Sequence, residues 1–357
     1  MFFDGAKPFV IAGPCSAETR EQVLETAAGL QGLPVRLFRA GVWKPRTRPG
    51  HFEGRGIPAL EWLQEVKRQF GLPVSVEIAE PAHAEAALAH GIDVVWIGAR
   101  TTVNPFQVQL LADALRGTGI PVMVKNPVTP DIELWIGAIE RLQKAGITEI
   151  AAVHRGFTSY GSASGYRNPP NWMIPIELKR RRPDLPLFCD PSHISGDRKR
   201  VAETAQKAMD MKFDGLMIET HPNPEVALSD AAQQISPATL KLLLDNLTIR
   251  TEFSPNLSGM AQLDHYRQSI DNLDAELIDI LALRIRLSEE IGLMKKEHNL
   301  TVYQPGRWRE IVENCRNRAA AKHLSPDFVV ALFEKIHDEG VRIQLSLFEG
   351  AEKEIIH

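Results

Sequence analysis

Hydrophobic and polar positions follow two different patterns in the two parts of this chain. Up to about residue 247, short apolar or β-branched runs alternate with longer amphipathic stretches. The runs predict strands at residues 9–12, 35–38, 74–78, 94–97, 122–124, 150–153, 187–189 and 216–218. The amphipathic stretches predict helices near residues 20–29, 56–70, 81–90, 104–116, 131–145, 172–181, 198–211 and 229–247. Strands that alternate with helices in this way indicate βαβ units and a parallel sheet.

The number of these units selects one parallel architecture over another. Eight strand–helix units within about 245 residues match the usual size of a (βα)₈, or TIM, barrel. A doubly wound open sheet is the competing fold, but no glycine-rich dinucleotide motif follows the first predicted strand. We therefore predict an α/β TIM barrel.

The rest of the chain predicts an all-helical region. Its apolar positions recur at mixed three- and four-residue spacing, at Leu263, Tyr266, Ile270, Leu273, Leu277, Leu281, Leu287 and Ile291. Without a breaker before about His298, this pattern predicts a helix of roughly 40 residues, ~60 Å long. Two shorter helices are expected at 306–321 and 326–347. Because so long a helix needs a partner along its length, we expect a homodimer through this region, or a larger homo-oligomer.

Turn residues separate the two patterns. Thr251–Asn256 contains a proline and helix-capping residues and is typical of a linker. The predicted organisation is a barrel domain at 1–247, a linker at 248–258 and a three-helix domain at 259–357.

Composition restricts the cellular compartment and the classes of binding partner that we expect. The formal net charge is −4, from 41 basic and 45 acidic residues, which argues against nucleic-acid binding. No apolar run approaches the roughly 18 residues that a membrane span needs, and the first residues do not read as a secretion signal. The three cysteines show no pairing pattern, so a reducing, cytoplasmic setting is expected.

Basic residues follow several of the predicted strands. Chemistry in this fold sits at the carboxyl ends of the strands. The six cations there are Arg39, Lys44, Arg46, Arg100, Lys125 and Arg155. Each alone could be a solvated loop residue. Together, on one rim of an acidic protein, they predict a site for phosphate and carboxylate groups.

A second group at the same rim could hold a metal ion. Cys15, His193, Glu219 and Asp230 offer one thiolate, one imidazole and two carboxylates. Such a mixed set suits Mn²⁺, Fe²⁺, Co²⁺ or Zn²⁺ better than Mg²⁺ or Ca²⁺. The alternative is structural, with Cys15 a small buried residue and His193 a turn residue after Pro191-Ser192.

Several motifs in these loops resemble one enzyme family over residues 8–246. They are Gly13-Pro14-Cys15-Ser16, Lys44-Pro45-Arg46-Thr47, Gly98-Ala99-Arg100, Asp190-Pro191-Ser192-His193, 214–224 and Leu228-Ser229-Asp230. Together they resemble the type I-beta 3-deoxy-D-arabino-heptulosonate 7-phosphate (DAHP) synthases. The resemblance implies condensation of phosphoenolpyruvate with erythrose 4-phosphate in the shikimate pathway.

The resemblance also implies a role for each residue. Cys15, His193, Glu219 and Asp230 would hold a divalent metal, Mn²⁺ by preference. Arg100, Lys125 and Arg155 would bind the phosphoenolpyruvate phosphate, with Arg39 and Lys44 near its reacting end. Arg46 and Thr47 would bind the aldose phosphate. Lys44 and His193 are the candidate proton carriers.

Related synthases offer alternatives. Octulosonate 8-phosphate synthases usually have Asn where this chain has Pro45-Arg46, which favours the four-carbon aldose. Lys125-Asn126-Pro127 departs from the usual Lys-Arg-Gly and looks like the sialic-acid synthases. This departure bears on the fifth loop rather than on the overall assignment.

The long helix carries a second set of candidates. Arg284 and Lys295 are 11 residues apart, so at about 100° per residue they share a face. Arg267 lies roughly 100° round the helix and is expected to face another pocket, in a partner chain. The alternative is that these basic residues are simply solvated.

Residues 266–274, then Arg284, Lys295, Arg307 and Gln344, resemble an AroQ-type chorismate mutase. In that family, arginines equivalent to Arg267 of one subunit and Arg284 and Arg307 of the other bind the two carboxylates of chorismate. Lys295 and Gln344 would donate to its ether oxygen. Gln304, Trp308 and Gly340 depart from the usual Asp, Glu and Ser. The alternative is a sensing and dimerising module, through which prephenate inhibits the synthase.

Overall fold

The computed structural model describes residues 2–5, 7–44, 50, 52–159, 165–250 and 257–349. The chain forms two compact units, Met1–Arg250 and Thr251–His357, and each is described by itself. The turn-rich segment 251–256 and the candidate phosphate ligands Arg46 and Thr47 lie outside the described residues.

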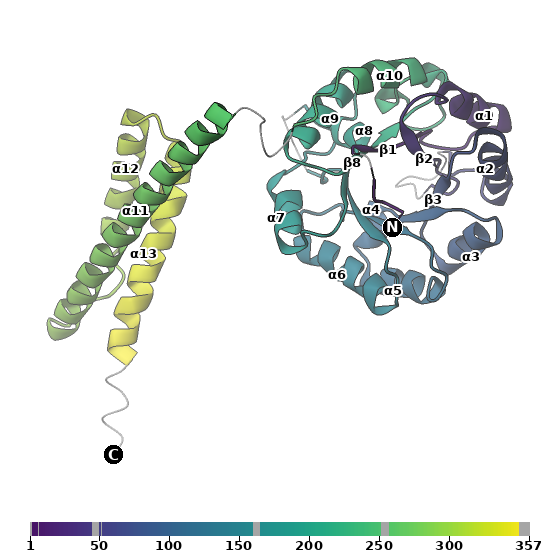
Figure 1. The fold of residues 1–357 in the computed structure, drawn as a ribbon. Helices are drawn as coiled ribbons and strands as arrows, with labels where there is room; N and C mark the ends of the chain where they lie inside the picture. Colours follow the sequence, from purple (N-terminus) through teal and green to yellow (C-terminus); the bar gives the residue numbers. More distant parts are fainter. Residues whose placement is uncertain are drawn as a thin grey trace. The chain divides into compact units, whose positions relative to one another are not determined.

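The first unit is a closed parallel barrel, as Figure 1 shows by the ring of helices around the strands. Its strands are β1 Phe9–Gly13, β2 Val35–Arg39, β3 Val74–Ile78, β4 Val94–Ile97, β5 Val122–Lys125, β6 Ile150–His154, β7 Leu187–Cys189 and β8 Gly215–Glu219. Strand β1 pairs with both β2 and β8, which closes the sheet. The predicted TIM barrel is confirmed.

Two apolar layers stabilise the barrel, because neighbouring residues of a strand point to opposite faces. Ile11, Leu37 and Met217 belong to the layer inside the barrel. Leu63 and Trp135, both fully buried, belong to the larger layer between strands and helices. Since side chains alternate along a strand, the row of Leu37 continues to Arg39 and the row of Met217 to Glu219. These charged side chains therefore reach the inside of the barrel at its carboxyl end.

The surrounding helices are α1 Arg20–Gly29, α2 Ile57–Phe70, α3 Pro81–Ala89, α4 Ala99–Thr102, α5 Pro105–Ala114, α6 Ile132–Lys144, α7 Met173–Arg181, α8 Pro191–Ser195, α9 Val201–Asp210 and α10 Pro237–Asp245. Local sequence explains where several of them begin. The side chains of Thr19, Asn104, Asp131 and Ser236 each accept a hydrogen bond from a first-turn N–H.

The predicted helix at 229–247 is wrong in its first half. Asp230 has a left-handed backbone with φ of 49°, and a 3₁₀ turn follows at Ala231–Gln233. Helix α10 begins only at Pro237, because proline suits the first turn but lacks the N–H that a helix interior needs. The irregular part is the loop that carries Asp230. The short helices α4 and α8 were not predicted.

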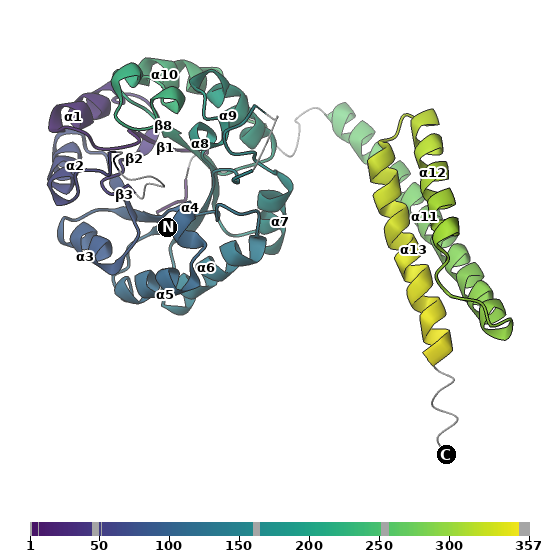
Figure 2. The ribbon, with the colours of Figure 1, turned by 180° about the vertical axis from the view of Figure 1, so that it is seen from behind.

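The second unit consists of α11 Leu257–Glu297, α12 Pro305–Ala321 and α13 Pro326–Glu349. Figure 2 shows these three helices packed along one another, and α13 contacts both α11 and α12. Much of α11 is uncovered: Leu273 is 58% exposed, Leu277 56% and Ile280 61%. None of the helices among the described residues is long and apolar enough to cross a membrane.

Candidate functional site

A tight backbone approach sets the position of Cys15. Gly13 ends β1 with φ of +146°, and a Cβ atom there would lie 2.1 Å from the carbonyl oxygen of Arg39. Only glycine fits this contact. The loop after β1 can therefore lie against the end of β2 and hold the fully buried Cys15 at the mouth.

The four predicted metal ligands come together at this mouth. Ligand atoms of Cys15, Glu219 and Asp230 all lie within 4.8 Å of one another. The Cys15 Sγ is 3.5 Å from Asp230 Oδ2. The His193 Nε2 lies 3.7 Å from Glu219 Oε1 and 4.0 Å from Asp230 Oδ2. Residues from the loop after β1, from α8, from β8 and from the loop after β8 thus converge on one region.

The electrostatics of this cluster fit a bound cation. Burial, and then the neighbouring Glu219 carboxylate, raise the pKa of the Cys15 thiol to about 12. Glu219 Oε1 is buried and accepts no hydrogen bond from the described residues, although Arg39 lies 3.2 Å away. Crowded buried acids are costly unless a positive charge compensates them. The thiol, imidazole and carboxylate donors suit a transition-metal ion.

Asp190 fixes the orientation of His193. Its Oδ2 lies 2.7 Å from His193 Nδ1, and its Oδ1 accepts the His193 backbone N–H at 3.0 Å. This contact leaves Nε2 directed at the carboxylates, an arrangement common around metal-binding histidines. Lys125 Nζ donates to the same Asp190 Oδ2 at 2.7 Å, so one buried carboxylate links the metal group to a cation of the rim.

The candidate cations near the cluster are largely buried. Arg39 is 1% exposed and donates to the Cys15 carbonyl at 3.2 Å. Lys44 Nζ lies 3.3 Å from Cys15 Sγ. Buried cations are retained only where acids or bound anions compensate them.

Arg155 and Arg100 lie on the next part of the rim. Burial lowers the pKa of Arg155 to about 10. Its guanidinium donates to the neutral oxygens of Asn168 at 2.7 Å and of Gly156 at 3.5 Å. Arg100 is exposed on the short helix α4. Both of these acceptors are neutral, and the Asp190 and Asp230 carboxylates offset part of the effect of burial on the pKa of Arg155.

Sequence reasoning missed four polar residues of this site. They are Asp190, Arg167, Asn168 and Gln233. Asp190 is part of the Asp-Pro-Ser-His motif and could have been found there, but the others lie in loops with no periodic signal. His154 ends β6 yet does not line the mouth. It packs among Trp135, Phe157, Trp172 and Phe213, and burial lowers its pKa to about 3.

Three candidate chorismate-binding residues of the helical unit lie where α11 packs against α13. Lys295 Nζ donates to Gln344 Oε1 at 3.1 Å and to the Val302 carbonyl at 2.6 Å. Arg284 donates to the Ile336 carbonyl at 3.2 Å. Both basic residues of α11 therefore face α13, and partial burial lowers the pKa of Lys295.

The other two arginines do not join this group within the chain. Arg267 and Arg307 have side chains 61% and 67% exposed, and each pairs with an acid three residues away. Arg267 precedes Arg284 by 17 residues, or ~25 Å along the helix.

The three departures from the mutase pattern lie on α12 and α13 or at their ends. The ring of Trp308 stacks on His337 at 4.7 Å. A Cβ atom on Gly340 would lie 3.8 Å from the Arg284 guanidinium. Gln304 precedes α12, and its side chain makes no capping hydrogen bond to the first turn.

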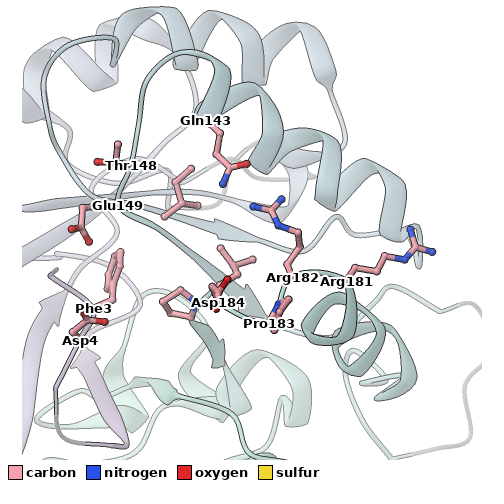
Figure 3. Close-up of a pocket in the computed structure, with 12 residues that line it drawn as sticks. Phe3, Asp4, Gln143, Thr148, Glu149, Arg181, Arg182, Pro183 and Asp184 are labelled. Carbon is pink, nitrogen blue, oxygen red and sulfur yellow. The ribbon is translucent and has the colours of Figure 1, made fainter.

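A cavity of about 480 Å³ lies at the opposite end of the barrel, shown in Figure 3. Ile150 at the start of β6 and Leu185 before β7 line it, together with charged residues such as Arg182 and Asp184. Active sites of this fold sit at the carboxyl ends of the strands, so this cavity is not the candidate active site.

Comparison with known proteins gives the same two regions. The model of the DAHP synthetase I family matches residues 3–252, and that of chorismate mutase type II matches residues 266–345. A phospho-2-dehydro-3-deoxyheptonate aldolase of Thermotoga maritima is 35% identical over 242 residues, covering 67% of this chain and 68% of the relative.

A 2-dehydro-3-deoxyphosphooctonate aldolase of Nitratidesulfovibrio vulgaris is 31% identical over 260 residues, covering 68% of this chain and 92% of the relative. The crystal structure of a Thermotoga maritima DAHP synthase superposes with a TM-score of 0.60 at 32% identity, covering 66% of this chain and 67% of that one. The chain is therefore a bifunctional enzyme that belongs to the DAHP synthetase I family over residues 3–252 and to the chorismate mutase type II family over residues 266–345.

Proposed function

We propose that the barrel condenses phosphoenolpyruvate with erythrose 4-phosphate and consumes one water molecule in a metal-dependent reaction that yields DAHP and phosphate. The observation that carries this proposal is the buried group of Cys15, Glu219 and Asp230 beside cations that face the same opening. Two phosphorylated substrates would balance those cations, and a divalent ion would balance the acids.

Cys15, His193, Glu219 and Asp230 would hold the ion. When bound, it would supply Lewis-acid polarisation of the aldehyde oxygen, which makes that carbon an electrophile for C3 of the enol. Mn²⁺ is the ion we expect, with Fe²⁺, Co²⁺ or Zn²⁺ as alternatives. The Asp190 contact keeps His193 Nε2 available to the site.

The cations of the rim would bind and orient the substrates. Arg155, Lys125 and Arg100 would bind the phosphate of phosphoenolpyruvate, since Arg155 donates to the neutral side-chain oxygen of Asn168 and Lys125 is held on Asp190. Fixed cations stabilise the negative charge that moves onto oxygen as phosphate leaves. Arg39 lies 3.2 Å from Glu219 and Lys44 lies 3.3 Å from Cys15, and Lys44 and His193 would be the proton carriers. Arg46 and Thr47 would bind the aldose phosphate.

We propose that the helical unit rearranges chorismate to prephenate. Lys295 and Gln344 already contact each other and would donate to the ether oxygen as its bond breaks. A pericyclic rearrangement needs a compact substrate conformer and charge stabilisation, and it needs no nucleophile. Arg284 and Arg307 would bind carboxylates together with Arg267 of a second copy.

A homodimer through α11 supports this arrangement. One helix cannot bring Arg267 to the pocket of Arg284, because ~25 Å of helix separates them. The exposed apolar side chains of Leu273 and Leu277 offer a surface that a second copy would cover.

The second candidate function is a sensing module that controls the barrel. The stack of Trp308 on His337 favours it, because this aromatic pair lies beside Arg284 and the Trp308 indole is less polar than the carboxylate usual at this position. Prephenate bound there would then inhibit the condensation.

The aldose assay tests the main proposal. Purified enzyme with Mn²⁺ and phosphoenolpyruvate is supplied with erythrose 4-phosphate or with arabinose 5-phosphate, and phosphate release is followed. We expect turnover with the four-carbon sugar and little with the five-carbon sugar. The opposite preference would contradict the proposal and favour an octulosonate 8-phosphate synthase.

A further inference from the structure

The two candidate carboxylate ligands share a polar contact that is not itself part of the metal group. Gln233 is fully buried in the 3₁₀ turn after β8. Its Nε2 donates to Glu219 Oε2 at 2.8 Å and lies 3.5 Å from Asp230 Oδ2. One amide therefore contacts both acids from the side of the protein.

The orientation of this amide is fixed by a cation behind it. Arg167 NH1 donates to Gln233 Oε1 at 2.6 Å. The same nitrogen donates to Asp230 Oδ1 at 3.0 Å. With Oε1 directed at a guanidinium, Nε2 must point at the carboxylates, and the reversed amide would place its oxygen against two acids.

These contacts determine which carboxylate oxygens of Glu219 and Asp230 remain available to bind a metal ion. Glu219 Oε2 is occupied by Gln233, whereas Glu219 Oε1 accepts no hydrogen bond from the described residues. Asp230 Oδ1 is occupied by Arg167, whereas Asp230 Oδ2 faces Cys15 Sγ at 3.5 Å. Glu219 is thus held through Oε2 and presents Oε1, whereas Asp230 is held mainly through Oδ1 and its Oδ2 receives only the longer 3.5 Å contacts of Gln233 Nε2 and Cys15 Sγ.

The Asp230 loop needs such support. Asp230 has a left-handed backbone and lies in an irregular loop rather than on a strand, so no sheet hydrogen bonds fix it. Arg167 comes from the loop after β6, and its backbone N–H donates to the carbonyl of Ser195 in α8 at 3.2 Å. Its neighbour Asn168 donates to the His193 carbonyl at 2.6 Å and accepts from Arg155 at 2.7 Å.

We infer that Gln233 and Arg167 are positioning residues of the metal site: Gln233 orients Glu219 and Asp230, and Arg167 orients Gln233. The inference rests on the metal site of the proposed function and adds two residues to it. Partners that orient metal ligands in this way usually contribute roughly 10–100-fold in metal affinity.

Mn²⁺ binding to the metal-free full-length protein tests the inference without any substrate. The loss of the six-line electron paramagnetic resonance signal of free Mn²⁺ gives the dissociation constant. Gln233→Met keeps the size of the side chain but removes its hydrogen bonds with Arg167, Glu219 and Asp230. We expect its dissociation constant to rise roughly 10–100-fold.

Gln109→Met is a matched control. Gln109 also lies between an arginine and an acid, accepting from Arg141 at 3.0 Å and donating to Asp113 at 3.2 Å, but on α5. The Mn²⁺ dissociation constant of Gln109→Met should equal that of the wild type. The melting temperature of each metal-free variant shows that the barrel is folded.

Variants of the half-exposed Arg167 separate orientation from charge. Arg167→Gln removes a cation, which by itself would favour Mn²⁺ binding. A weaker affinity in this variant therefore reports lost orientation. Arg167→Lys keeps the charge and can donate from one nitrogen to both partners, so it should restore part of the affinity.

The possible results are distinct. Wild-type affinity in Gln233→Met, or a tighter affinity in Arg167→Gln, would overturn the inference while leaving the metal site in place. If the wild type itself binds no Mn²⁺, the proposed metal-dependent function fails, and this inference fails with it.

Discussion

The barrel and the helical unit differ in how much of a functional site one chain can complete. In the barrel, Arg39, Lys125 and Glu219 are buried, and each lies against another group of the same unit. In the helical unit, Arg267 and Arg307 are exposed, and each pairs with an acid one turn away. Among the described residues, the candidate metal ligands of the barrel meet within one chain, whereas Arg267 and Arg307 of the helical unit pair with neighbours on their own helices.

The architectures explain this difference. A closed sheet has no free edge, and its outer face is covered by helices, so Leu63 and Trp135 are fully buried. Three helices with one of 41 residues cannot enclose the whole length of that helix, and Leu277 stays 56% exposed. We therefore expect the barrel chemistry to depend on the ion, and the helix chemistry to depend on a second copy.

Removal of the metal should give the largest difference between the activities of the two units. With excess EDTA, the condensation should fall to the background rate, because the acids of the barrel site lose the cation that they hold. Rearrangement of chorismate should stay unchanged, since the Lys295–Gln344 pair needs no ion. Both rates are measured on the same sample, and Mn²⁺ should restore the first. If the condensation survives chelation, the metal site is wrong.

Lys295→Met should have the next largest effect, and on the helical unit alone. Removing a donor to a developing charge usually costs roughly 10²–10³-fold in rate. We expect that loss in chorismate rearrangement, followed by absorbance. Lys322→Met, a change of an exposed lysine after α12, is the control. A wild type without any rearrangement would instead favour the sensing module, and prephenate inhibition of the condensation would then be its signature.

Core truncations should show the smallest effect, one of stability. Leu63→Ala in the barrel should lower the free energy of unfolding by about 2–5 kcal/mol at any protein concentration. Leu277→Ala should lower the melting temperature of the helical unit only at concentrations at which a dimer forms, because this side chain is exposed in one chain. Calorimetry over a hundredfold concentration range checks both. An unchanged melting temperature for Leu277→Ala at high concentration would argue against the dimer through α11.

The periodic parts of the fold were predictable because periodicity reports burial directly. Strands such as β3 and β4 lie where the apolar runs placed them. The segment 229–247 was not predictable in the same way, because a left-handed Asp230 and a 3₁₀ turn leave no regular pattern. Its amphipathic character alone favoured a helix.

The site was predictable where motifs and strand ends coincide. Cys15, His193, Glu219 and Asp230 were chosen from the sequence, and the structure places their ligand atoms near one point. The residues that orient them were not predicted. Strands β7 and β8 and the helices α7, α8 and α9 separate Arg167 from Gln233 along the chain, and no spacing rule connects the two residues.

By itself, the sequence determined the type of each unit and the chemistry of its candidate residues. Both are local properties, because they depend on the spacing of apolar positions along the chain and on the kinds of side chain present. The tertiary structure decided which atoms face each other. It directed His154 into the helix layer and Asp190 into the mouth, although both lie at strand ends. The physical reason is that side-chain direction depends on strand register and barrel closure, which only the complete set of pairings defines.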